Sequence, residues 1–168
     1  MDEIERRQRA MVVAEARTWL RTPYHHNQRL KGAGVDCANL PAAVYAAVGL
    51  IPEIPPEEYP AQWHLHRDQE RYLGRVLDHA TEFAGPPDAG AGNPNEMGAC
   101  APGPGDFVLW KVGRCWAHGA IVIEWPVIIH AAARAGAVIL GDALRDAFDK
   151  KLLTDREPRY FTLWGGAR

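Results

Sequence analysis

The spacing of the apolar residues changes once along this chain, and that change constrains the fold more than any other feature. Between residues 2 and 84, large apolar side chains recur every three or four positions, which is typical of amphipathic helices. From residue 106 onward they alternate or form short runs, which indicates β-strands. Helices followed by strands predict an α+β domain in which N-terminal helices pack on a mainly antiparallel sheet of about five strands.

The predicted elements divide the chain into a helical part and a strand part. Helices are expected at 2–20, 37–50 and 61–84, and strands at 106–110, 118–124, 127–131, 137–140 and 159–164. The segment 85–105 is rich in Gly and Pro and is expected to be a loop. We therefore expect one domain over residues 1–168, with a helical insert near 57–84 and the loop 85–105.

Charge and hydropathy exclude two classes of protein. Lys plus Arg number 19 and Asp plus Glu number 21, so the net charge is −2. Without a basic surplus, the chain is not expected to bind nucleic acid. No 18-residue apolar window predicts a membrane span, and the charged N-terminus does not resemble a secretion signal. The expected site of synthesis is the cytoplasm.

The strongest local signal is Cys37 in the run Gly34-Val35-Asp36-Cys37, at the expected start of the second helix. A thiol there lies near unpaired backbone N–H groups and the positive end of the helix dipole, which both favour the thiolate. This predicts that Cys37 is the most acidic of the three cysteines. The alternative is a small buried Cys that packs the helix start.

Pro41 complicates this interpretation. If Asp36 caps the helix, Pro41 removes a backbone donor just past the first turn. Either the helix starts nearer Asn39, or its first turn is irregular.

A thiolate nucleophile needs a base and a group that orients the base. His118 opens the expected strand 118–124, and His130 lies in the next one. A three-residue turn at 124–126 would pair positions whose numbers sum to 250. His118 would then lie diagonal to His130 on one face, with their Cβ atoms roughly 7 Å apart. A two-residue turn would put them on opposite faces. The alternative is that each histidine is a structural residue of its strand, with its ring nitrogens hydrogen-bonded.

The remaining cysteines suggest no metal site. Cys115 and His118 could form half of a zinc site, but no second pair has suitable spacing. Cys100 lies in the expected loop. An odd number of cysteines leaves at least one thiol free. We expect neither a metal nor an organic cofactor.

Five short motifs, taken in order, resemble those of the NlpC-type cell-wall cysteine peptidases. They are Thr22-Pro23-Tyr24, Gly34-Val35-Asp36-Cys37, Gly105-Asp106-Phe107-Val108-Leu109-Trp110, His118-Gly119-Ala120-Ile121-Val122 and Ile129-His130-Ala131. The pattern looks most similar to the phage and prophage branch of this family, whose members are identified as phage cell-wall peptidases.

This resemblance implies a papain-like fold and hydrolysis of peptidoglycan peptides without a cofactor. It implies that Cys37 is the nucleophile, His118 the base and His130 the orienting residue. Tyr24 and Asp36 match positions that contact the substrate. It also implies phage tail proteins as partners and carriage on a phage tail or particle.

The sequence departs from the family just after the nucleophile. Ala38 and Asn39 stand where peptidoglycan-cleaving members usually have Ser and Gly. Because that Ser helps to bind the stem peptide, we expect a weaker or altered preference for a free amino terminus. Two alternatives stay open: a non-catalytic phage tail or assembly protein that keeps the fold, and a Cys–His acyltransferase or thioesterase.

Overall fold

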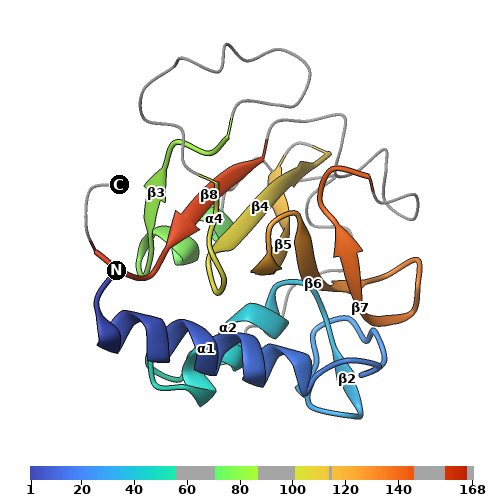
Figure 1. Ribbon diagram of the computed structural model, residues 1–168. Coiled ribbons are helices and arrows are strands. Elements are labelled where there is room, and N and C mark those ends of the chain that lie inside the picture. The colour runs from blue at the N-terminus through green and yellow to red at the C-terminus, as the bar shows by residue number, and fades with distance from the viewer. Residues whose placement is uncertain (56–70, 87–100, 114, 146–157, 166–168) are drawn as a thin grey trace.

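The computed structural model describes residues 1–55, 71–86, 101–113, 115–145 and 158–165, and within them a layer of helices lies against an antiparallel sheet (Figure 1). The helices are α1 (Glu3–Arg17), α2 (Asn39–Ala47) and α4 (Arg71–Leu77). The six-stranded sheet has the order β3 (Thr81–Phe83), β8 (Arg159–Thr162), β4 (Phe107–Val112), β5 (Cys115–Glu124), β6 (Val127–Ala132) and β7 (Ala137–Asp142). A small second sheet pairs β1 (Arg29–Leu30) with β2 (Gly34–Val35). The predicted α+β class is confirmed.

All five predicted strands are present, as β4 to β8, but the predicted third helix is partly wrong. Only Arg71–Leu77 of the range 61–84 is helical in the described residues, and residues 61–70 lie outside them. Residues Thr81–Phe83 instead form the edge strand β3, which pairs with β8. Pairing with a strand almost 80 positions away overrides the local helical spacing, because tertiary context decides weak propensities.

Other predictions fall partly on residues outside the described ranges. The helical insert begins at 57 and the Gly- and Pro-rich loop covers 85–105, but 56–70 and 87–100 are not described. Gly49, two residues after the end of α2, has the positive φ of 74° that favours glycine just beyond a helix C-terminus. None of the helices in the described residues is long and apolar enough to cross a membrane.

The sheet is buried on both faces. One face packs against the helices, in a cluster that joins helix residues Val12, Leu40 and Val44 to strand residues Leu109, Ile121, Ile129 and Phe161. The other face carries a second buried cluster that includes Val108, Trp110, Ala120, Val122, Ile128 and Tyr160. Burial on both faces explains why these strands read as continuous apolar runs rather than as a strict alternation.

Arg9 of α1 connects the helical layer to the sheet. Its side chain is buried, and its guanidinium donates to the Asp106 carboxylate at 2.9 Å and to the Pro104 carbonyl at 2.8 Å. It also donates to Glu5 at 2.8 Å and lies 4.0 Å from the centre of the Trp164 ring. These contacts fix α1 against the chain that enters β4 and the chain that leaves β8.

We expect Arg9→Met to destabilise the protein by about 3–5 kcal/mol, because it leaves the buried Asp106 carboxylate without its counter-charge. Urea denaturation followed by circular dichroism measures this loss. Arg6→Met is the matched control: Arg6 makes an exposed ion pair with Glu3 on the same helix, so its loss should cost less than about 1 kcal/mol.

Adding Asp106→Asn to Arg9→Met should recover part of the lost stability, since the orphaned charge is then removed. Equal losses for Arg9→Met and Arg6→Met would contradict a central role for the buried pair.

Candidate active site

The hairpin of β5 and β6 brings His118 and His130 together. The Nε2 atom of His118 lies 2.9 Å from the Nδ1 atom of His130, and the two rings meet edge to face at a centroid distance of 5.1 Å. One nitrogen donates to the other, so the two neutral rings carry their protons on the same ring position, both on Nε2 if His118 donates and both on Nδ1 if His130 donates. The predicted shared face is therefore present, and the Nδ1 atom of His118 remains for other chemistry.

The predicted register is confirmed, but the predicted three-residue turn is wrong. The hairpin turns through the two residues Trp125 and Pro126, which a cis peptide bond joins. The pairs are Glu124↔Val127 at the turn, and Val122↔Ile128 and Ile121↔Ile129 beyond it. The sum changes from 251 to 250 because a bulge interrupts β5 between the first two pairs. The bulge restores the parity that the short turn would otherwise break.

His118 lies in an apolar setting. Its side chain is almost fully buried, and its ring centroid is 6.1 Å from that of Trp110 on the neighbouring strand β4. Burial lowers the pKa of His118 to about 4, because the charged imidazolium loses its hydration. His118 is therefore neutral at pH 7 and can accept a proton.

The Cys37 thiol lies against β5 beside this histidine. Its Sγ donates to the Ala117 carbonyl at a distance of 3.4 Å, and Ala117 directly precedes His118. The Gly119 backbone N–H, on the other side of His118 in sequence, also interacts with the thiol. The backbone groups on either side of His118 thus hold the Cys37 sulfur. The structure brings His118 and His130 into direct contact, and the catalytic role of the three residues stays a prediction.

The thiol is not acidic, contrary to the sequence prediction. Burial first, and then the neighbouring Asp36 carboxylate, raise the pKa of Cys37 to about 12. The backbone N–H groups of Cys37, Ala38 and Gly119 lower it, but by less. Regular helix begins only at Asn39, two residues after Cys37. The backbone donors expected at the helix start are present, but burial and the Asp36 charge outweigh them.

Asp36 holds the segment that leads to Cys37 in place. Its carboxylate is buried and accepts hydrogen bonds from the backbone N–H of Asn39 at 2.9 Å and that of Asn27 at 2.6 Å. The side-chain amide of Asn39 adds a third, at 3.0 Å. Asp36 therefore caps the start of α2 and ties it to the loop that contains Asn27. Its predicted contact with substrate stays a prediction.

Tyr24 also lies beside the nucleophile. Its backbone forms a parallel bridge with Val35, two residues before Cys37. The pKa of its hydroxyl is raised by burial and then by the charges of Cys37 and Asp36, so the hydroxyl remains protonated and can donate a hydrogen bond. Its role in substrate binding stays a prediction.

Two residues of the site escaped the sequence analysis. Tyr72 of α4 donates from its hydroxyl to the Cys37 carbonyl at 3.1 Å. Gly119 leaves room for it, because a Cβ at that position would lie 2.3 Å from the Tyr72 hydroxyl oxygen. A Gly inside a strand is a signal of close approach that the sequence does contain. No spacing relates Tyr72 to Cys37, so only the structure could show their contact.

The other two cysteines are Cys115 and Cys100. Cys115 is a buried thiol at the start of β5, and Cys100 falls outside the described residues. Within the part of the chain that the structure describes, no cluster of three His, Cys, Asp or Glu side chains could hold a metal ion.

Solved structures share this fold at low sequence identity. No protein-family model and no curated protein sequence matches the chain. The NlpC/p60 domain of the peptidoglycan hydrolase SagA is similar with a TM-score of 0.54 and 19% identity, over 90% of this chain and 96% of that one. The peptidoglycan hydrolase RipB from Mycobacterium tuberculosis gives 0.58 and 17%, over 99% and 70%.

A third similar structure is the P60 domain of an antigen from M. avium subspecies paratuberculosis. It has a TM-score of 0.54 and 15% identity, over 97% of this chain and 99% of that domain. These likenesses show that the chain has the α+β fold of NlpC/p60 domains, as the papain-like prediction requires.

Because the pKa of His118 is lowered in the folded protein, the free energy of unfolding should decrease in acid. The unfolded chain binds a proton at this side chain below about pH 6.5, whereas the folded protein does so only below about pH 4. Stability should therefore fall by roughly 3 kcal/mol as the pH drops from 6.5 to 4. Urea denaturation at several pH values measures this loss.

His118→Gln, which cannot take up the proton, should lose less stability over the same interval. His25→Gln is the control: His25 is exposed and should behave like the wild type. Parallel acid profiles for wild type and His118→Gln would contradict the burial argument.

The raised pKa of Cys37 should appear in its alkylation. In a Cys100→Ser, Cys115→Ser background, iodoacetamide should label Cys37 slowly at pH 7, and the rate should rise up to about pH 12 as the thiolate forms. Asp36→Asn removes the adjacent negative charge, so its rate profile should move to lower pH. A wild-type rate that levels off below pH 8 would contradict the assignment and favour the acidic thiol expected from the sequence.

Proposed function

We propose that this protein is a cysteine hydrolase that cleaves amide bonds in bacterial cell-wall peptides. The proposal assigns Cys37 as nucleophile, His118 as general base and His130 as the residue that orients His118. One observation supports it most directly: the 2.9 Å contact between the two histidines lies beside a thiol held at the carbonyl that precedes His118. In this arrangement the proposed nucleophile is placed beside the proposed base, and the base contacts the group that orients it, as cysteine hydrolysis requires.

The neutral resting state defines the first chemical step. Sγ attacks the amide carbonyl while its proton moves to Nδ1 of His118, so no free thiolate needs to exist beforehand. The imidazolium formed in this way donates from Nε2 to Nδ1 of His130, which stabilises the new charge. His118 then gives its proton to the leaving amine, and a thioester with Cys37 remains.

Water completes the cycle through the same residues. His118 takes a proton from the water that attacks the thioester, and returns it to the departing sulfur. The product is a free carboxylate, and the thiol is restored. In both steps the Tyr24 hydroxyl and the Cys37 backbone N–H supply donors for the oxygen that becomes negative.

The substrate class is inferred from fold and motifs together. SagA and RipB, two proteins with this fold, are described as peptidoglycan hydrolases. The motifs around Tyr24, Cys37 and His118 resemble those of the phage and prophage branch. We therefore propose peptidoglycan stem peptides as substrate, contacted by Tyr24 and Asp36. We also propose synthesis in the cytoplasm and carriage on a phage tail or particle.

Digestion of purified peptidoglycan, followed by chromatography of the released fragments, tests this function. Cys37→Ala should abolish product release, and His118→Ala should reduce kcat/KM by at least the roughly 10²–10⁴-fold that general acid–base catalysis supplies. His130→Ala should cost less, because His130 acts through His118. His130→Gln should retain more activity than His130→Ala, since its amide oxygen can accept the Nε2–H of His118.

Arg17→Gln is the control for these variants, because Arg17 is exposed at the end of α1. It should leave turnover unchanged. Fragments released equally by the wild type and Cys37→Ala would refute the proposed nucleophile. A folded wild type that releases no fragments would favour a non-catalytic tail or assembly protein.

A further inference from the structure

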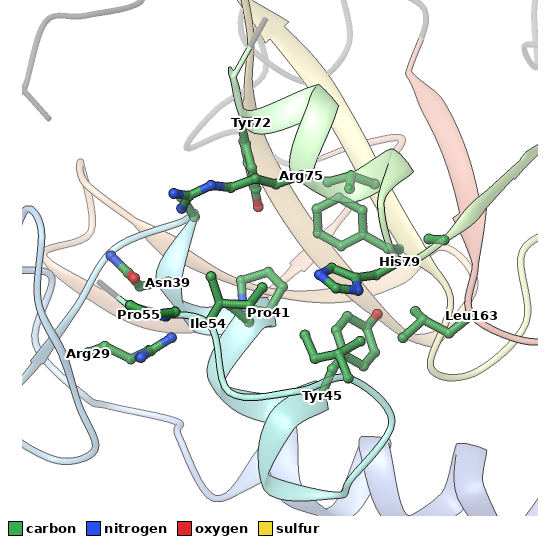
Figure 2. Close-up of a pocket in the computed structure, with 16 residues that line it drawn as sticks. Arg29, Asn39, Pro41, Tyr45, Ile54, Pro55, Tyr72, Arg75, His79 and Leu163 are labelled. Carbon is green, nitrogen blue, oxygen red and sulfur yellow. The ribbon is translucent and has the colours of Figure 1, made fainter. Parts of the chain in front are cut away.

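A pocket lies between α2 and α4, on the side of α2 that faces away from α1 (Figure 2). Most of its lining side chains are apolar. They include Ala42, Tyr45, Ile54, Val76, Phe107 and Leu163, which come from both helices, the segment after α2, strand β4 and the chain after β8. The proposed reaction at Cys37 uses none of these side chains. Concave apolar sites with a few polar groups at one end are typical of small-molecule binding.

The two arginines and the asparagine that line this pocket lie toward one end, and the exposed His79 lies at the other. Figure 2 shows Arg29, Asn39 and Arg75 on the same side of the pocket, with Leu163 and His79 on the opposite side. The Arg29 side chain is only 14% exposed, and its ion pair among the described residues joins it to Glu53 at 3.8 Å. The Glu53 side chain is 86% exposed. A guanidinium with five donors is thus left largely buried, with one long ion-pair contact to an exposed partner.

Charge complementarity therefore favours an anion at this end. A planar guanidinium binds a carboxylate through paired hydrogen bonds, and partial burial strengthens them. The Asn39 amide lies at the same end and can add a donor. Arg75, on α4, adds a second positive charge. The pocket thus combines a cationic mouth with an apolar interior.

The walls favour a hydrocarbon chain over a peptide. Residues of α2 and α4 use their backbone N–H and C=O groups within the helices, so they offer no edge for a peptide backbone. Pro41 and Pro55, which also line the pocket, have no N–H to donate. A buried peptide segment would leave its own polar groups without partners, which is costly, whereas an alkyl chain has none.

We propose that this pocket binds a carboxylate joined to a hydrocarbon chain, with the carboxylate at Arg29, Asn39 and Arg75 and the chain between α2 and α4. The site adjoins the nucleophile: Ala38 and Asn39 follow Cys37 directly and line the pocket. Tyr72 lines it too and donates to the Cys37 carbonyl. The inference concerns binding alone, so it does not depend on the proposed hydrolysis.

Isothermal titration calorimetry of the wild-type protein with hexanoate, octanoate and decanoate tests the chain. Each added methylene that enters the pocket should tighten binding by about fourfold. Octan-1-ol and octyltrimethylammonium test the charge: both should bind at least tenfold more weakly than octanoate.

Variants test the polar end and the apolar interior of the pocket separately. Arg29→Gln should weaken octanoate by about tenfold or more and leave octan-1-ol unchanged. Ala42→Phe, which fills the interior, should weaken both. Arg17→Gln, the same change at an exposed position, should alter neither. Circular dichroism confirms that each variant is folded.

Three results would overturn the proposal. One is equal affinity of the wild type for octanoate and octan-1-ol. Another is the lack of saturable binding across the chain series. The third is tighter binding of N-acetyl-leucine than of octanoate, which would assign the pocket to a peptide end. Because binding is measured without turnover, these outcomes are distinct from a failure of peptidoglycan hydrolysis.

Discussion

The buried ion pair of Arg9 and Asp106 holds the two layers of this domain together. Burial of two charges is unfavourable unless each is paired and hydrogen-bonded, and here both conditions are met. Asp106 also accepts from the Gly103 backbone N–H at 2.7 Å, and Arg9 reaches Thr162 of β8 at 3.3 Å. Helix α1 is thereby placed against β4 and β8. Helix α2 packs with α1 in the same apolar core, so the pair also fixes the layer from which Cys37 approaches β5.

The fold was predictable because most local preferences agree with it. The strands follow apolar runs bounded by Gly and Pro, and α1 follows a clear helical spacing with Asp2 as its N-cap. Strand β3 was not predictable, since Thr81–Phe83 gains its structure only by pairing with β8. The hairpin shows a further limit. Its register was predicted correctly although the predicted turn length was wrong. A bulge in β5 compensates for the shorter loop. No local sequence feature indicates that bulge.

Some features of the candidate site were also predictable from the sequence, and others were not. Cys37, His118 and His130 could be found because residue type and strand parity carry the information. The electrostatics of Cys37 could not, because its thiol pKa depends on burial and on Asp36, which also caps α2. Sequence position at a helix start predicted an acidic thiol. The structure reverses this, since desolvation exceeds what nearby backbone N–H groups supply when the helix begins two residues later.

The half-buried Cys37 thiol and the buried His118 imidazole are both neutral at rest. An ion pair at rest would have to offset the desolvation of two charges, and Asp36 would oppose the thiolate. In the proposed reaction, the neutral pair avoids that cost and separates charge only when a substrate carbonyl accepts the sulfur. Helix α4 contacts both Cys37 and the adjacent pocket. Through Tyr72 it holds the Cys37 carbonyl, and through Tyr72, Arg75 and Val76 it forms one wall of the adjacent pocket. A molecule that fills the pocket contacts the same helix that fixes the nucleophile, so occupancy of the pocket and the placement of the sulfur share one structural element.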